Sequence, residues 1–299
     1  MTATLATSTP TAVQSRRTAR LNLPALRALF TFTLRQHRHG KRWMVMAALM
    51  LLPAGLAVLV RCTAHGVPSV GLEFIFAFMF IPQALLPLAA LIYASGIIQD
   101  EQEDQTITYL LIRPLPKWAI YIVKLLATLT VTVALAILFT ALTYVAIYAG
   151  ANADGINDVT TRCLKACALH SLAIVAYGCL FGLLSILTQR TLIVGIIYIA
   201  VVEGLFANLA FGIRLITVIY YARLLAYRTL TFIIPTPTGT QDFAADAWQL
   251  DIANDPTLQE HPQFRTCLLV LLGASISFAV LAAVLCAHRE FHVKTPEKR

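Results

Sequence analysis

Apolar residues form six long runs along the chain, and each run has the length of a membrane-crossing helix. A bilayer core of about 30 Å requires about 20 predominantly apolar residues in an α-helix. Charged and turn-forming residues separate the runs, so the pattern predicts six transmembrane helices. The predicted spans are residues 43–60, 70–98, 119–149, 166–187, 192–210 and 266–287.

The composition of the chain agrees with this pattern. The 299 residues are 58% hydrophobic and 13% charged, whereas soluble domains carry about 25% charged residues. This balance excludes a disordered chain and an ordinary soluble enzyme. We therefore expect an all-α integral membrane protein in which residues 43–287 form one transmembrane domain.

The basic residues are divided unevenly between the two sets of loops. Sixteen of the 23 lie in the N-terminal segment, the loops after spans two and four, and the C-terminal tail, and seven lie on the opposite side. Because cytoplasmic loops carry the excess of Lys and Arg, both termini are predicted to be cytoplasmic. The protein is expected in the plasma (inner) membrane. The net charge of +8 then reflects topology, and no nucleic acid partner is expected.

Three terminal features complete the expected organisation. Residues 1–22 are rich in Thr, Ala and Ser and are predicted to be disordered, and residues 288–299 are predicted to be a cytoplasmic tail. Residues 23–42 place apolar side chains near helical spacing between arginines, which predicts an amphipathic helix in the membrane interface. This helix is expected to contact membrane lipid, to brace a cytoplasmic partner, or both.

The segment between spans five and six, residues 211–265, does not fit a seventh span. Its apolar first part contains Arg214, Arg223 and Arg228, and one arginine at the bilayer centre costs about 2.5–3.5 kcal/mol. We therefore predict re-entrant or interfacial helices there. The following residues 235–262 are turn-rich and acidic, and are predicted to form an extracytoplasmic loop.

The loop between spans two and three, residues 99–118, carries the most informative pattern. Four acids stand within positions 100–104, followed by an apolar run, prolines and lysines. Acids are poor anchors on a negatively charged leaflet, so a basic protein partner explains them better. Acids also suit the N-terminal end of a helix, and Pro114 and Pro116 are expected to end it. We predict a short cytoplasmic helix that transmits force from a soluble subunit.

This loop resembles the coupling segment of the ABC-2-type permeases, the membrane subunits of one group of ATP-binding-cassette exporters. The family pattern is a small residue, an acidic cluster, Gly-Thr, a Leu-Leu pair, a proline, a basic residue and a lysine entering the next span. Gln105 replaces the usual glycine. The likeness in span number, arm and insertion covers nearly the whole chain. The remaining places are held by Gly96, Glu101, Glu103, Asp104, Thr106, Leu110, Leu111, Pro114, Lys117 and Lys124.

The resemblance implies a permease subunit of an exporter that moves an unidentified substrate across or out of the membrane. Its loop would dock as a coupling helix on a separate cytoplasmic ABC ATPase subunit, and a second permease copy or paralogue would complete a dimer. ATP and magnesium would bind to the ATPase, because this chain has no phosphate-binding loop. We expect no catalytic residue, cofactor or metal site here. The implied docking residues are Glu101, Glu103, Asp104, Thr106 and Arg113.

Glu203 lies inside the fifth predicted span, where an acid is a candidate functional residue. It belongs either to the translocation path or to a structural hydrogen bond. Arg214 shares its helical face but lies about 16 Å away along a straight helix, so an ion pair would need a break in the helix. Glu73 and His170 are expected near the outer membrane surface.

Small residues in the fourth span suggest close helix packing. Gly178 and Gly182 form a G-x-x-x-G face, which serves either dimerisation or packing within one subunit. The six cysteines are expected to act mainly as small apolar residues in or near the membrane helices.

Three alternative functions stay open. An intramembrane enzyme would need His, Asp or Lys clustered at one membrane face, whereas the seven histidines are scattered. An ion-coupled secondary transporter would favour paired intramembrane charges and repeated broken helices, but only the second span is broken, by Pro82 and Pro87. A non-transporting membrane anchor of a cytoplasmic complex would also use an acidic docking loop.

Overall fold

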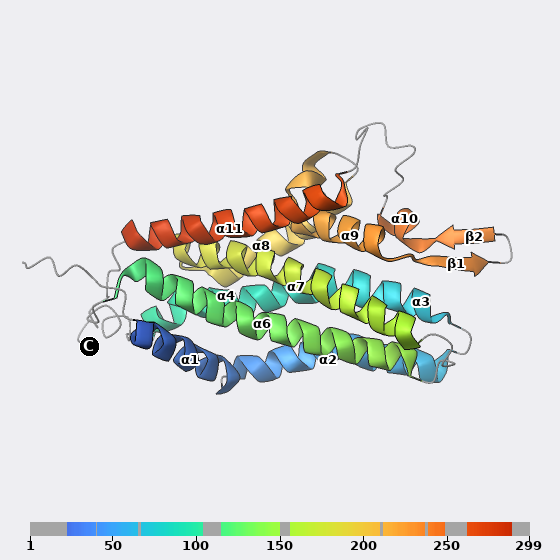
Figure 1. The fold of residues 1–299 in the computed structure, drawn as a ribbon, viewed down its shortest axis with the longest axis horizontal. Coiled ribbons are helices and arrows are strands. Elements are labelled where there is room, and N and C mark those ends of the chain that lie inside the picture. The colour runs from blue at the N-terminus through green and yellow to red at the C-terminus, as the bar shows by residue number, and fades with distance from the viewer. Residues whose placement is uncertain are drawn as a thin grey trace, which may run out of the picture.

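The computed structural model describes residues 23–39, 41–64, 67–103, 115–149, 156–209, 212–236, 239–248 and 262–288. Long helices lie side by side, with α1 at one end of the bundle and the strands at the other (Figure 1). We call these the arm end and the hairpin end. The elements are α1 (Leu23–His39), α2 (Lys41–Thr63), α3 (Ser69–Leu72), η1 (Glu73–Leu85), α4 (Leu86–Glu103), α6 (Lys117–Tyr148), α7 (Ile156–Leu187), α8 (Thr191–Tyr198), η2 (Ile199–Leu205), η3 (Phe206–Asn208), η4 (Gly212–Ile216), α9 (Val218–Thr229), β1 (Ile233–Thr236), β2 (Gly239–Asp242), α10 (Phe243–Trp248) and α11 (Phe264–His288).

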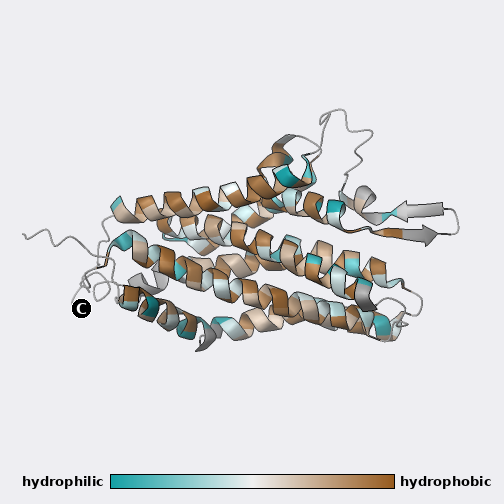
Figure 2. Cartoon of the chain, in the orientation of Figure 1, coloured by the Kyte–Doolittle hydropathy of each residue, from teal (hydrophilic) through white to brown (hydrophobic). Residues whose placement is uncertain are grey.

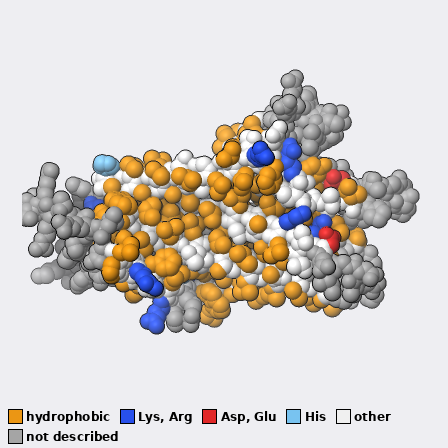
Figure 3. All heavy atoms as spheres, viewed as in Figure 1, with side chains coloured by type: hydrophobic (Ala, Val, Ile, Leu, Met, Phe, Trp, Pro, Cys, Tyr) orange, Lys and Arg blue, Asp and Glu red, His pale blue; other side chains and the backbone are white. Residues whose placement is uncertain are grey.

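Six helical segments in the described part of the chain are long and apolar enough to cross a membrane, which confirms the predicted number of spans. Hydrophobic residues run along these helices (Figure 2). On the face seen in Figure 3, hydrophobic side chains cover the middle and the charged ones lie toward the two ends. The segments are Arg42–Thr63, Ser69–Ile97, Lys117–Tyr148, Asp158–Leu187, Thr191–Asn208 and Phe264–His288.

Helix α7 forms the centre of the bundle. The most apolar 18-residue window of its span is 72% buried, against 28% for α2, 22% for the α8 span and 17% for α11. Helix α7 packs against α4, α6, α9 and α11, so most of its surface contacts other helices of the same chain. The outer helices instead present wide apolar faces, as expected for helices in contact with lipid or another membrane protein.

Two glycines of α7 allow this close packing. A Cβ atom added at Gly182 would lie 2.7 Å from the Tyr121 hydroxyl and 3.2 Å from Leu125 Cδ1. One added at Gly178 would lie 2.5 Å from Leu129 Cδ2. All three neighbours belong to α6, so the glycine face is used for packing within one subunit.

Gly182→Leu is therefore expected to destabilise the fold by about 1–3 kcal/mol, the usual cost of overpacking a filled interior. The matched control is Gly273→Leu in α11, where an added Cβ atom meets no atom within 4 Å. The measurement is the temperature at which half of the detergent-solubilised protein stays monodisperse on size-exclusion chromatography. Equal midpoints for the two variants would contradict the packing assignment.

The chain after the fifth span folds back onto the bundle. Turns η3 and η4 follow Leu205, and α9 then packs against α7, α11 and η1 with residues 218–226 buried. Strands β1 and β2 pair antiparallel, from Ile233 opposite Asp242 to Thr236 opposite Gly239. Helices η4 and α9 lie in this region, and their predicted re-entrant or interfacial position stays a prediction. The strand pair differs from the predicted loop. Residues 237–238 and 249–261 lie outside the described part.

Candidate functional site

The acidic segment begins on the last turn of a membrane helix. Helix α4 continues from Leu86 to Glu103, so Glu101 and Glu103 extend the second span instead of opening a separate helix. No glycine or proline lies between residues 97 and 103 to end the helix earlier. Asp104, Thr106 and Arg113 lie outside the described residues, so a coupling helix over this segment stays a prediction.

The position of these acids on α4 is informative. The C-terminal end of a helix carries partial negative charge, which disfavours acidic side chains there. Asp100, Glu101 and Glu103 all occupy the last turn of α4. Acids at the C-terminal end of a helix are not explained by stabilisation of that helix.

Both ends of the connection between α4 and α6 are fixed to the bundle. The buried Lys124 Nζ of α6 donates to the carbonyl oxygen of Ile97 in α4 at 3.1 Å. On the other side of the connection, Leu115 packs with Leu29 of α1 and Ile120 of α6. The segment between residues 98 and 114 is thus connected to two membrane helices through buried contacts.

Helix α1 packs along α6, as the position of the two helices in Figure 1 shows. His37 Nε2 lies 3.0 Å from Thr128 Oγ1, and its ring meets Tyr93 edge-on at a centroid distance of 5.3 Å. Leu29 and Thr33 are buried on the same face. The helix predicted over residues 23–42 is present as Leu23–His39, and its inner face braces the start of α6.

Glu203 is fully buried and makes four hydrogen bonds. Its carboxylate accepts from the hydroxyls of Tyr177 and Tyr198, each at 3.0 Å. It also accepts from the backbone N–H groups of Val218 at 3.1 Å and Ile219 at 3.0 Å. These two groups belong to the first turn of α9, where helical N–H groups lack intrahelical partners. Glu203 therefore caps α9 from a neighbouring segment.

The sequence suggested Arg214 as the partner of Glu203, whereas the structure shows these four donors at the carboxylate. The helix break that an ion pair would need is present after Leu205, but the returning chain brings the start of α9 to the carboxylate. The Arg214 guanidinium lies over the ring of Tyr220 at 5.2 Å instead. Of the two sequence-based roles, the contacts agree with the structural one.

Arg223 anchors the middle of α9. The buried guanidinium donates to Asn208 Oδ1 and to Gln83 Oε1, each at 2.9 Å. These acceptors lie in η3 and η1, so one side chain joins three segments that are distant in sequence. Arg223, one of the three arginines that argued against a seventh lipid-facing span, is thus buried within protein, where hydrogen bonds solvate its charge.

A second polar cluster lies at the hairpin end. Arg162 Nε lies 3.0 and 3.1 Å from the two carboxylate oxygens of Glu73, and the hydroxyls of Tyr144 and Tyr148 each donate to that carboxylate at 2.6 Å. Glu73 is fully buried within the bundle, and its expected location near the outer membrane surface stays a prediction. The missed signal was a pair of opposite charges, Glu73 and Arg162, at the same ends of spans two and four.

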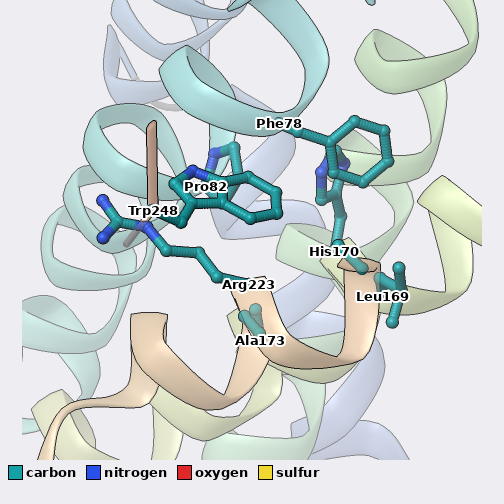
Figure 4. Close-up of a pocket in the computed structure, with 9 residues that line it drawn as sticks. Phe78, Pro82, Leu169, His170, Ala173, Arg223 and Trp248 are labelled. Carbon is teal, nitrogen blue, oxygen red and sulfur yellow. The ribbon is translucent and has the colours of Figure 1, made fainter. Parts of the chain in front are cut away.

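His170 is also buried, and its expected location near the outer membrane surface stays a prediction. Its Nδ1 lies 2.8 Å from Thr140 Oγ1, and its ring packs against Phe78 at a centroid distance of 5.7 Å. Together with Trp248 of α10 it lines a small pocket near the hairpin end (Figure 4). The cavity volume of this pocket is only about 10 Å³. Its lining is mainly apolar: Phe78, Pro82, Leu169, His170, Ala173, Ala222, Arg223, Ala226 and Trp248.

Six apolar helical spans in the described residues, with charge clusters buried between them, define a multi-pass membrane protein. The model of a family described as ABC-2 family transporter protein matches residues 34–234. This match covers more than half of the chain, and the chain belongs to that family. It is a membrane permease of an ABC-type transporter, a class that associates with an ABC ATPase subunit. No curated protein matches the sequence.

The family match confirms the expected membership of the ABC-2-type permease family. It includes the first five spans, the segment 98–114 and α9, and it ends within β1, before α11. The two polar clusters around α9 and Glu73 therefore lie inside the matched region, together with the candidate docking residues.

Proposed function

We propose that the chain is the permease subunit of an ABC exporter and that the acidic end of α4 is where its ATPase docks. The observation that carries this proposal is the acidic cluster at the C-terminal end of a membrane helix, a position where it does not stabilise that helix. A cationic surface of the ATPase would compensate this charge. Glu101, Glu103 and Asp104 are the acidic contacts, and Thr106 and Arg113 complete the docking segment.

Movement of the docked ATPase reaches the membrane helices through the two fixed ends of the connection. Lys124 joins α6 to the carbonyl of Ile97, and Leu115 is held between α1 and α6. A push on the segment therefore displaces α4 and α6 together instead of bending a loose loop. ATP and magnesium bind on the ATPase, and hydrolysis of this ATP drives transport of the unidentified substrate.

The arm end of the bundle faces the cytoplasm of a plasma membrane in this proposal. This orientation follows from the excess of Lys and Arg on that side. Residues 27 and 35 are exposed arginines on α1, where they suit contact with anionic lipid headgroups. The exposed apolar faces of α2, α8 and α11 are available for lipid and for a second permease copy or paralogue.

The docking assignment predicts a charge-dependent complex. The tagged chain is purified in mild detergent from its native cells, and ATPase activity of the eluate is measured. Glu101→Lys combined with Glu103→Lys is expected to lower the recovered ATPase at least about tenfold, because two attractive contacts become repulsive. The matched control is Glu290→Lys with Glu297→Lys, which makes the same charge change in the C-terminal tail.

Two results would reject parts of this proposal. Recovery of the ATPase with the docking variant at the wild-type level would move the docking site elsewhere. Absence of an ATPase from the wild-type eluate in several detergents would reject the exporter mechanism. Coupled activity distinguishes the permease from a non-transporting anchor. A permease couples ATP hydrolysis to substrate movement, and an anchor does not.

A further inference from the structure

Two cysteines of α7 stand one helical turn apart near the hairpin end. Cys163 and Cys167 are separated by four positions within the helix Ile156–Leu187, so their side chains project from the same face. Cys163 is partly buried and Cys167 is buried. Both thiols are free, and a side-chain hydrogen bond joins them. The helix therefore presents a contiguous pair of thiols.

Neighbouring elements enclose this pair on its inner side. Cys167 Sγ donates to the carbonyl oxygen of Ile137 in α6 at 3.8 Å. Cys163 packs against the hydrophobic core, and the charge of Glu73 in η1 acts on it. That charge is already paired with Arg162, whose Nε lies 3.0 Å from the carboxylate. The thiols thus lie between α6, α7 and η1, beside the ion pair and not engaged by it.

The pair is accessible from the water phase at the hairpin end. Asp158 and Thr160 in the first turns of α7 are exposed, and Cys163 keeps a partly exposed side chain one turn further along. At 1.5 Å per residue, Cys163 lies about 10 Å from the start of the helix. An ion can therefore arrive at Cys163 and be held by the deeper Cys167.

The helix prevents the two thiols from closing into a disulfide. Side chains four positions apart on a helix have Cβ atoms about 5–6 Å apart, whereas a disulfide needs about 3.5–4.5 Å. In the orientation proposed above, this end of the bundle faces the outside, where disulfides form and persist. An intact α7 leaves these two groups as thiols, and they stay available as metal ligands.

The surroundings select an ion that needs only two ligands. Within the described residues, no group of three or more His, Cys, Asp or Glu side chains is arranged to hold a metal, whereas a structural zinc ion takes four ligands. Thiolates favour soft ions such as copper(I), which accepts two sulfurs in line. With bonds near the length of about 2.3 Å known for zinc, a linear ion separates the sulfurs by about 4.6 Å. Cβ atoms about 5–6 Å apart allow that span.

We propose that Cys163 and Cys167 form a two-coordinate site for a soft monovalent cation of the copper(I) and silver(I) class. Binding breaks two S–H bonds, forms two metal–sulfur bonds and releases two protons to water, with no change of oxidation state. The complex carries one net negative charge, and water at the partly exposed end of the site lowers its cost. The bound ion links two successive turns of α7 and requires neither the ATPase nor a transported substrate.

The test counts bound ions in the full chain, purified in detergent without oxygen. The probe is copper(I), kept reduced by ascorbate and held by an excess of a colorimetric chelator, so that isolated thiols do not compete. Cys163→Ala and Cys167→Ala are each expected to bind one ion fewer than the wild type. The double variant should lose the same single ion, because both thiols belong to one site. Monodispersity on size-exclusion chromatography checks that each variant is folded.

A register control keeps the number of thiols constant. Cys167→Ala combined with Ala168→Cys moves one thiol to the next position, which lies about 140° around the helix from Cys163 at 3.6 residues per turn. Ala168 is exposed, so the larger side chain fits there. This variant should bind as few ions as Cys167→Ala. Cys62→Ala, which removes an exposed thiol of α2, should bind as many as the wild type.

The number of released protons tests the site without any substitution. In weakly buffered solution at about pH 6, below the usual thiol pKa, each ion bound at the pair should release two protons. One proton per ion would indicate a single thiol and overturn the proposal. An unchanged ion number in Cys163→Ala or Cys167→Ala, two ions lost in the double variant, or wild-type binding by the register variant would overturn it as well.

The metal site and the exporter mechanism fail separately, because the titration uses the chain without an ATPase. An ion bound at the pair with a failed pull-down would leave a soft-metal site in a membrane protein whose motor is not the proposed one. A successful pull-down without a bound ion would leave the exporter proposal intact and make Cys163 and Cys167 packing residues only.

Discussion

Arg162→Met is expected to destabilise the protein by about 3–5 kcal/mol, because it leaves the buried carboxylate of Glu73 without its counter-ion. Glu73 is 0% exposed, and Arg162 Nε lies 3.0 Å from it. Tyr144 and Tyr148 still donate to the carboxylate in the variant, but neutral hydroxyls do not cancel its charge. The measurement is the midpoint of unfolding on titration with sodium dodecyl sulfate, followed by tryptophan fluorescence.

The double variant Glu73→Gln with Arg162→Met separates charge from packing. It removes both charges, and the amide oxygen at position 73 still accepts from a tyrosine hydroxyl, so most of the lost stability should return. Replacing a whole buried pair is often close to neutral. Arg265→Met, at an exposed arginine, is the control for loss of one surface cation. A double variant as unstable as the single one would show that lost packing, and not the unpaired charge, dominates.

The membrane fold was predictable because hydropathy alone determines it. Each predicted span lies within or close to a described helix of sufficient length, and the arm helix ends at His39 instead of residue 42. Span ends were less predictable. The fourth span begins at Asp158 instead of Ala166, because its helix starts before the apolar run does. Polar residues there are accommodated where neighbouring helices cover them.

The location of Glu73 shows why burial at span ends could not be read from the sequence. Helices α6 and α7 each contain 32 residues, which is about 48 Å at 1.5 Å per residue, longer than a bilayer core of about 30 Å. Their extra turns cover Glu73 with Tyr144 and Arg162. A residue near the end of its own span is therefore enclosed by longer neighbours, a tertiary fact that hydropathy does not encode.

The docking segment and Glu203 were identified for chemical reasons, with different outcomes. The acidic segment was recognised by its pattern, and the family match agrees with it, although Asp104, Thr106 and Arg113 lie outside the described residues. Glu203 was singled out as an acid within a predicted span, and the structure shows it buried. Its partners were missed because helical angles describe a straight helix, whereas here the chain reverses and α9 supplies backbone donors.

Glu203→Ala is expected to destabilise the protein by about 3–4 kcal/mol, because several buried donors lose their acceptor and each unsatisfied group costs about 1–3 kcal/mol. The affected donors are the hydroxyls of Tyr177 and Tyr198 and the first N–H groups of α9. Glu203→Gln keeps one acceptor oxygen, so it should lose about half as much. Tyr177→Phe removes a single donor and should cost about 1 kcal/mol.

Hydrogen exchange locates this effect and separates the two roles considered for Glu203. If the carboxylate caps α9, the amides of Val218 and Ile219 should exchange faster in Glu203→Ala, while those of α11 stay protected. If Glu203 instead serves the translocation path, the alanine variant should keep its unfolding midpoint and its α9 protection but lose substrate movement. The four hydrogen bonds to Glu203 favour the first result, because a carboxylate engaged by that many donors has little capacity left to bind a passing ligand.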